Sequence, residues 1–340
     1  MRKLFIEMEK RFNNKEDLVL VTIVGSFGAT PRGAGARMLV GESGRISGTI
    51  GGGTVEFRSV ELAKEVLEKQ TSAFKRYILH QNQVEDLGMI CGGNVTLFFR
   101  FIKGNDNHML NLCHTVLEQF SEKKTTWLIT ELTDSLDGAM GLYSEKLGLV
   151  GNIPDEATEK LSGQTCTFEL TGKRFFAEQI LSPGFVYIFG GGHVSQELVP
   201  VLSHLEFRCI VLDDRPEFST KELFPDAVDV RMTVMSEIKE MSEITAEDYI
   251  IVLTRGHSFD QAVEEQALST PASYIGVIGS KSKRGIVEKN LLEHGFSPED
   301  IKRVTAPIGL LGIKAQTPAE LAISIAGQLI AFRAGAGIII

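Results

Sequence analysis

Short apolar runs alternate with amphipathic stretches through the second half of the chain. Five of these runs are predicted strands, over residues 185–189, 207–212, 226–230, 249–253 and 274–278. Two stretches between them, residues 195–205 and 259–268, and a third after the last run, residues 282–293, have helical spacing. Strands that are apolar on both faces are typical of a parallel sheet covered by helices. The pattern therefore predicts repeated strand–helix–strand units.

A final helix is predicted from Thr317 to about residue 332. Thr317 can cap its first turn, Pro318 suits the first helical position, and Glu320 occupies the reciprocal position of a capping box.

The first half of the chain is less regular. Strands are predicted over residues 18–24, 37–40, 45–50, 74–79, 95–102 and 126–130, and helices over residues 55–69 and 110–120. Gly41-Glu42-Ser43-Gly44 indicates a hairpin turn. This mixture predicts an α+β domain, which we place over residues 1–178.

Composition and charge argue against several classes of protein. The chain has 340 residues, is 43% hydrophobic and 23% charged, and has a formal net charge of −9. This balance is typical of a folded protein and argues against a broad basic face for nucleic acid. Without a long apolar run or a signal-like start, we expect no membrane segment and a cytoplasmic location. The four cysteines form no CxxC pair, which disfavours a zinc ribbon or clustered iron–sulfur ligands.

A glycine-rich turn follows the first strand of the regular half. Gly190, Gly191 and Gly192, with His193, stand between that strand and the next helix, and Asp213 closes the second strand. Such glycines let phosphate approach the helix start, and an acid at this spacing can meet a ribose hydroxyl. The pattern predicts a Rossmann-like domain over residues 184–335, preceded by the α+β domain, in an α/β protein. A nucleotide-fold domain without a nucleotide is the alternative.

Two glycine-rich loops in the first half carry arginines. Arg32 and Arg37 lie among glycines in residues 28–37, and Gly51, Gly52 and Gly53 open a helix that contains Glu56. Exposed amides and arginine forks can form an anion cradle. The alternative is a pair of tight turns with incidental arginines.

Cys91 is followed by Gly92 and Gly93. A cysteine beside glycines is accessible, and its sulfur can bind a soft metal or carry sulfur. A small buried residue at a turn is the equally open alternative. Two polar loops, residues 254–260 and 279–284, follow strands at the edge where such sheets bind ligands. The first also fits an ordinary helix start, and the basic residues of the second also fit solvated surface side chains.

Several of these blocks, in this order, resemble the XdhC/CoxI family of accessory proteins of molybdenum hydroxylases such as xanthine dehydrogenase. The resemblance covers nearly the whole chain. It is carried by the following segments: Pro31-Arg32, residues 35–38, residues 48–53 with Glu56, Cys91-Gly92-Gly93, residues 189–194, residues 213–215, residues 274–280 and residues 309–322. Family members often carry serine two residues before the Pro-Arg pair, where this chain has Ala29.

The resemblance implies a cofactor-binding maturation factor rather than an enzyme. Such proteins bind the molybdenum cofactor (molybdopterin), protect it while its terminal sulfur is installed, and pass it to the apo-hydroxylase of purine metabolism. It also implies a homodimer that interacts with a xanthine dehydrogenase-type hydroxylase and a cysteine desulfurase. Members can carry the name of the hydroxylase itself.

On this reading Arg32 and Arg37 would hold phosphate, Gly51–Gly53 would donate amides, and Cys91 would lie near the metal. Gly190–Gly192 and Asp213 would bind a nucleotide, NAD(P) among the candidates. Which half holds the cofactor stays open. The rival is an NAD(P)-dependent oxidoreductase built on the Rossmann-like half, and a weaker third reading makes that half a dimerisation platform.

Overall fold

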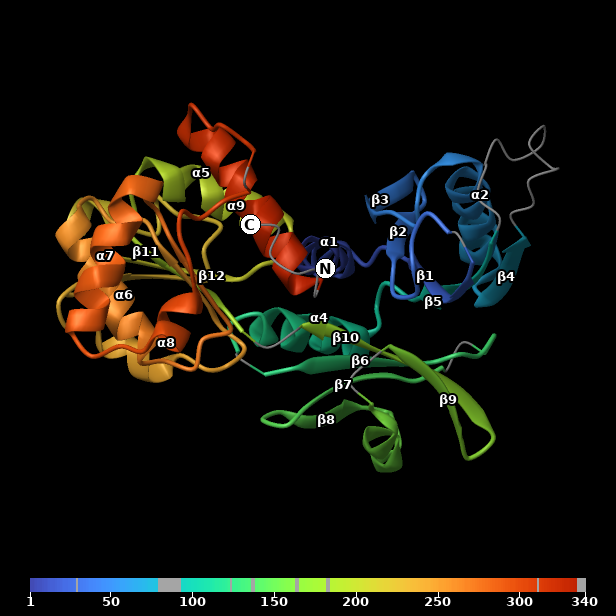
Figure 1. Cartoon of the computed structure of the whole chain (residues 1–340). Coiled ribbons are helices and arrows are strands. Elements are labelled where there is room, and N and C mark those ends of the chain that lie inside the picture. Colours follow the sequence, from blue (N-terminus) through green and yellow to red (C-terminus); the bar gives the residue numbers. More distant parts are fainter. Residues whose placement is uncertain are drawn as a thin grey trace. The chain divides into compact units, whose positions relative to one another are not determined.

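The computed structural model describes residues 1–28, 30–78, 93–122, 124–135, 138–162, 165–181, 184–310 and 312–334. Ala29, Cys91 and Gly92 lie outside these ranges. The chain divides into two compact units, Met1–Ser182 and Pro183–Ile340. Each unit is described by itself (Figure 1). Among the described residues, no helix is both long enough and apolar enough to cross a bilayer.

The described part of the first unit contains two antiparallel sheets. The first has the order β3-β2-β1-β5-β4, with β1 (Leu18–Phe27), β2 (Arg37–Gly41), β3 (Gly44–Gly48), β4 (Ala73–Ile78) and β5 (Asn94–Ile102). The second has the order β8-β7-β6-β10-β9, with β6 (Thr126–Glu131), β7 (Met140–Ser144), β8 (Gly148–Gly151), β9 (Cys166–Leu170) and β10 (Lys173–Leu181). The helices are α1 (Arg2–Asn13), α2 (Gly53–Lys69) and α4 (Asn107–Gln119).

Strand β1 shows how the first sheet is buried on both faces. Leu18 and Leu20 pack with α1 and α4 in a core that also includes residues of the second sheet. Val19 and Val21 point the other way, toward Val55 and Ala63 of α2. Because side chains alternate along a strand, one apolar run serves both cores.

The second unit is a parallel sheet covered by helices. Its order is β13-β12-β11-β14-β15-β16, with β11 (Val186–Phe189), β12 (Cys209–Asp213), β13 (Asp229–Met232), β14 (Tyr249–Val252), β15 (Tyr274–Val277) and β16 (Val304–Thr305). Its helices are α5 (His193–His204), α6 (His257–Leu268), α7 (Lys281–Glu293), α8 (Pro298–Lys302) and α9 (Pro318–Arg333). This order reverses at β11, as in dinucleotide-binding sheets.

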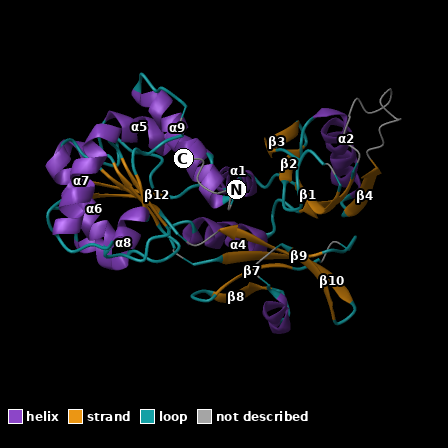
Figure 2. Cartoon of the chain, viewed as in Figure 1, coloured by secondary structure: helices purple, strands orange, loops and turns teal. Residues whose placement is uncertain are grey.

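Helices cover both faces of this sheet (Figure 2). Val186 and Ile188 of β11 pack in the core that contains residues of α5 and α9, whereas Phe185, Tyr187 and Phe189 face the core with α6 and α7. Thr317 and Glu320 form the predicted capping box at the start of α9. The predicted α/β fold class and Rossmann-like parallel sheet are confirmed.

Several elements were not predicted. Helix α1 buries Leu4, Phe5, Met8 and Phe12, a helical spacing hidden among charged residues. Strands β7, β8 and β10 were also missed, and with them the second sheet. The predicted first domain ends at residue 178, which lies inside β10, and the first compact unit includes the whole of that strand.

Candidate functional site

The loop between β3 and α2 is folded around the carboxylate of Glu56. Its Oε2 atom accepts hydrogen bonds from the backbone amides of Ile50 and Gly52, both at 3.0 Å, and from the Thr49 hydroxyl. The Arg45 guanidinium lies 3.3 Å from Oε1. Donors therefore gather around an anion in this loop (the cradle below), and that anion is a carboxylate of the same chain; binding of a ligand anion here stays a prediction.

The surroundings keep Glu56 ionised. Burial by itself raises the pKa of Glu56, but the hydrogen bonds from Thr49, Gly52 and Ile50 and the charge of Arg45 outweigh it and lower the pKa overall. A negative charge at the start of α2 also interacts favourably with the helix dipole.

The loop that contains Arg32 lies against this cradle. A side chain at Gly51 would stand 2.7 Å from Cβ of Pro31 and 3.7 Å from Cγ of Arg32. Gly51 and Gly52 have positive φ angles of 126° and 75°, which favour glycine. Space is open in front of Gly52, and Arg32 is exposed. The structure thus brings Arg32 together with the predicted glycines.

Arg37 lies elsewhere, in the interior of the first unit. Its guanidinium pairs with Glu178 of β10, and the two side chains are only 4% and 5% exposed. Burial lowers the pKa of Arg37 to about 10. Its Nε atom has no acceptor among the described residues. Arg37 therefore connects the two sheets, and the expected contact with a phosphate would require this pair to open.

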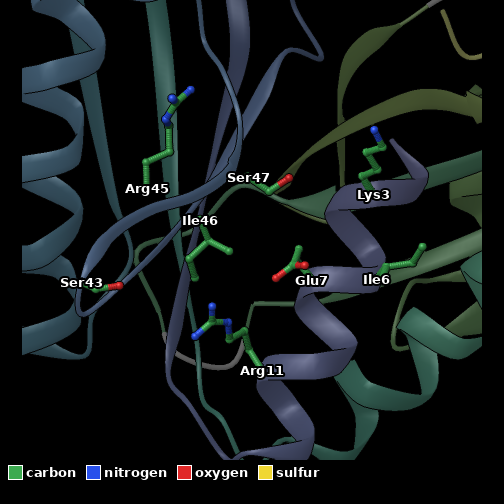
Figure 3. Close-up of a pocket in the computed structure, with 8 residues that line it drawn as sticks. All are labelled: Lys3, Ile6, Glu7, Arg11, Ser43, Arg45, Ile46 and Ser47. Carbon is green, nitrogen blue, oxygen red and sulfur yellow. The ribbon is translucent and has the colours of Figure 1, made fainter. Parts of the chain in front are cut away.

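A pocket of about 610 Å³ lies between α1 and the β2–β3 hairpin. It is lined by Lys3, Ile6, Glu7, Arg11, Ser43, Arg45, Ile46 and Ser47, with Glu7 and Arg11 pointing toward the hairpin (Figure 3). Arg11 pairs with Glu16 at 2.8 Å, and Arg45 is shared with Glu56. The pocket adjoins the cradle through Arg45, but no residue predicted for the site lines it.

In the glycine loop of the second unit, Gly190 and Gly191 have no room for a side chain, whereas Gly192 does. A side chain at Gly190 would stand 2.3 Å from the Leu253 carbonyl oxygen, and one at Gly191 would stand 2.3 Å from the Phe218 carbonyl oxygen. At Gly192 nothing lies within 4 Å, and the neighbouring His193 is exposed. The first two glycines therefore allow close packing, whereas Gly192 leaves the start of α5 open to a ligand.

Asp213 holds this loop in place. Its carboxylate, in a residue only 1% exposed, accepts from the Gly191 amide at 2.7 Å and from the amide, Nε and Nη2 of Arg215, each at 2.9 Å. Burial raises its pKa, but the bonds from Arg215 and Gly191 outweigh this and lower it overall. Four donors fill the usual capacity of a carboxylate, so a ribose at Asp213 would have to displace one of them.

The described cysteines do not form a metal site. Cys113 and Cys209 are buried, and Cys166 is partly buried. Burial raises the pKa of Cys113 to about 12 and also raises the pKa of Cys209. In the described part of the chain, His, Cys, Asp and Glu side chains form no group of three that could hold a metal ion. Cys91 lies outside the described residues, whereas Gly93 lies next to the start of β5.

Two family models match the sequence, one in each compact unit. The XdhC and CoxI family matches residues 12–78, and the XdhC Rossmann domain matches residues 186–329. The chain belongs to the XdhC/CoxI family.

Individual XdhC/CoxI-like relatives align along nearly the whole chain. A probable xanthine dehydrogenase subunit of Bacillus subtilis is 25% identical, with 96% of each chain covered. The molybdenum cofactor insertion chaperone PaoD of Escherichia coli is 23% identical over 93% of this chain and 83% of PaoD. A crystal structure of a xanthine dehydrogenase from Bacillus halodurans has a TM-score of 0.77 and 24% identity over 97% of this chain and 96% of that chain. That likeness establishes a shared fold.

Sequence reasoning missed three residues of these XdhC/CoxI loops. Arg45 and Thr49 complete the donors around Glu56, and Arg215 clamps Asp213. Arg215 directly follows the acidic pair 213–214. A positive residue so close to Asp213 could have indicated that this carboxylate pairs with its own chain. Glu178, which pairs with Arg37, was missed as well. No sequence signal pointed to it, because the two residues are 141 positions apart.

Proposed function

We propose that this chain is a maturation factor that holds the molybdenum cofactor and inserts it into a xanthine dehydrogenase-type hydroxylase. The similarity to PaoD along 93% of the chain carries this proposal, because PaoD is named as a molybdenum cofactor insertion chaperone. Both units have family matches, so the likeness is not confined to a nucleotide-fold domain.

The placement of the cysteines supports a carrier over the hydroxylase itself. An iron–sulfur cluster needs thiolate ligands gathered at one place, usually four. The whole sequence has four cysteines, and two of them are buried in the cores of different units, Cys113 in the first and Cys209 in the second. We therefore do not carry the hydroxylase activity in the name of the Bacillus subtilis relative over to this chain.

We place the phosphate end of the cofactor at the open side of the cradle of the first unit, beside the donors that Glu56 already uses. Arg32 is exposed beside Gly51, and the space in front of Gly52 is open. In our proposal Arg32 holds the phosphate, Gly51–Gly53 allow its close approach, and Cys91 with Gly92 and Gly93 lies near the metal. When bound, the cofactor supplies the molybdenum and terminal sulfur that the hydroxylase uses. We further propose a cytoplasmic homodimer that meets a cysteine desulfurase during sulfuration.

Anaerobic reconstitution tests this proposal. Purified full-length chain is mixed with molybdenum cofactor, and the retained molybdenum and pterin are measured after gel filtration. We expect Arg32→Ala and Cys91→Ala each to lower retention by about tenfold or more, since each would lose a charge-assisted or metal contact. Arg76→Ala is the matched control, because Arg76 is an exposed arginine on β4.

Equal retention in all three variants and the unaltered chain would remove the site from this cradle. Failure of the unaltered chain to retain cofactor, or to activate an apo-hydroxylase, would reject the maturation role. The rival oxidoreductase predicts turnover of NAD(P)H by the isolated chain. A chain that retains cofactor but shows no such turnover would exclude that rival.

A further inference from the structure

The pocket of about 610 Å³ between α1 and the β2–β3 hairpin, called the hairpin pocket below, has no part in the proposed function. Helix α1 contributes residues 3, 6, 7 and 11 to its lining, a spacing that places side chains on one side of a helix. The hairpin contributes residues 43 and 45–47. Most of the lining therefore comes from regular elements of one compact unit, which hold side chains more precisely than loops do.

Four lining residues of the hairpin pocket are charged, and only two of them have counterions. Arg11 and Arg45 lie 2.8 Å and 3.3 Å from carboxylates that do not line the pocket. The other two are Lys3 and Glu7, and neither side chain has a hydrogen-bond or ion-pair partner among the described residues. The pocket therefore offers one positive and one negative charge that the chain itself leaves unpaired.

Lys3 and Glu7 are neighbours on α1 but do not neutralise each other. Side chains four residues apart can pair across one helical turn, although lysine before glutamate is the less favourable order. In Figure 3, Lys3 extends toward one end of the pocket, whereas Glu7 points toward the hairpin. A ligand with both charges would satisfy both residues. A net anion such as phosphate would be repelled by Glu7.

The rest of the lining completes a site for a carboxylate with an apolar group attached. Arg45 is 51% exposed and makes both of its contacts through Nη1, so its guanidinium keeps donors for a ligand. Ser47 lies between Arg45 and Lys3 in Figure 3. The half-buried Ile6 and Ile46 supply an apolar wall. A few polar groups beside an apolar wall are typical of small-molecule sites.

We propose that the hairpin pocket binds a small zwitterion, an α-amino acid with an apolar side chain. Lys3 and Arg45 hold its carboxylate, Glu7 holds its ammonium group, and its side chain lies against Ile6 and Ile46. This inference goes beyond the proposed function and does not depend on it, because none of the residues proposed for the cofactor lines this pocket.

Ligand-observed NMR titrations of the full-length chain test the charge requirement. The probes are L-leucine, leucine amide, which lacks the carboxylate, and N-acetyl-leucine, which lacks the ammonium group. We expect L-leucine to bind at millimolar concentration or below. Each blocked probe should bind at least about tenfold more weakly, because it loses a charge-assisted contact.

Two variants, each matched to one blocked probe, test the assigned contacts. Lys3→Gln should weaken binding of L-leucine by at least about tenfold but should not weaken binding of leucine amide, which has no carboxylate to lose. Glu7→Gln should weaken binding of L-leucine but not of N-acetyl-leucine. Lys10→Gln is the control, because Lys10 is exposed on the same helix and does not line the pocket.

Absence of L-leucine binding, or L-leucine binding that both pocket variants leave unchanged, would overturn the inference. Tighter binding of N-acetyl-leucine than of L-leucine would show that the pocket selects an anion, and the zwitterion would be rejected. Cofactor retention measured on Lys3→Gln and Glu7→Gln keeps this result separate from the maturation role, since both variants should retain cofactor as the unaltered chain does.

Discussion

The ion pair between Arg37 and Glu178 is the most buried charge contact described in the first unit. We expect Glu178→Gln to destabilise that unit by about 3–5 kcal/mol, because it leaves the Arg37 charge without its counterion in an apolar interior. Urea denaturation followed by far-UV circular dichroism measures the change.

An exposed pair provides the comparison for this prediction. Glu122 and Lys146 are 33% and 64% exposed and lie 2.7 Å apart, so Glu122→Gln should change stability by no more than about 1 kcal/mol. The double variant Arg37→Met with Glu178→Gln should regain part of the loss, since no lone charge is then buried. Equal losses at the two sites would show that the buried pair contributes no more than a surface contact.

Glu56 should make the first unit sensitive to acid. Its pKa is lower in the folded chain than the value of about 4.3 expected in the unfolded chain. The unfolded state therefore binds the proton more tightly, so the stability from Glu56 is complete above about pH 4.3 and is lost as the pH falls through the folded pKa. Glu56→Gln should flatten this part of the stability–pH curve and remove about 1–2 kcal/mol at neutral pH.

Glu61→Gln serves as the control for Glu56, because Glu61 is 54% exposed on the same helix and pairs with Lys64. Denaturant titrations between neutral pH and pH 3 give the two curves. A Glu56→Gln curve with the slope of the unaltered chain would mean that the carboxylate does not carry the acid response.

Residue types indicated which loops need glycine, but not what the charged side chains beside them contact. The glycines around Gly51 and Gly190 were recognisable because tight turns and close approaches need glycine. In the structure the amides of those turns donate to Glu56 and Asp213, which are acids of the same chain. These contacts depend on side-chain directions, which sequence spacing does not determine. Whether these loops also bind a ligand stays a prediction.

At the scale of elements, the capping box of α9 is a local feature with a measurable effect. Thr317 accepts from the Glu320 amide, and Glu320 accepts from the Thr317 amide. We expect Thr317→Ala to cost about 1 kcal/mol, measured by denaturant unfolding. Thr115→Ala, at a half-buried position inside α4 where the hydroxyl donates to the Asn111 carbonyl oxygen of the same helix, should cost clearly less, and equal effects would argue against the cap.

Elements with strong local patterns were predictable, and elements defined by tertiary pairing were not. Strands β11, β12, β14 and β15 are apolar on both faces, so sequence and structure agree within a few residues. Strand β8 is only four residues long, and all four of its residues are partly buried. Such segments become strands because partners lie beside them, which a one-dimensional pattern does not record.

At the scale of the whole chain, the two compact units should unfold separately. Leu39 and Leu198 are both fully buried, the first in the core with α1 and the second in the core with α9. We expect each Leu→Ala change to cost about 2–5 kcal/mol and to lower the midpoint of its own unit alone. Trp127, the single tryptophan, lies in the first unit, so its fluorescence reports on that unit, whereas circular dichroism reports on both.

The two leucine variants distinguish separate unfolding of the units from unfolding of the whole chain. Leu198→Ala should leave the fluorescence transition unchanged and shift part of the circular dichroism transition, and Leu39→Ala should shift the fluorescence transition. A fluorescence midpoint that moves equally in both variants would show that the chain unfolds as one cooperative body.

The separation between Arg37 and Glu178 limits how this protein can be cut or recombined. The first family match ends at residue 78, a hundred positions before the carboxylate that neutralises Arg37. If residues 12–78 are grafted onto another scaffold, Arg37 is transferred without Glu178. A guanidinium that is buried in this protein would then have no counterion. Any transplant of the Arg32 loop should therefore carry β10 with it, or replace Arg37 by an apolar side chain of similar length.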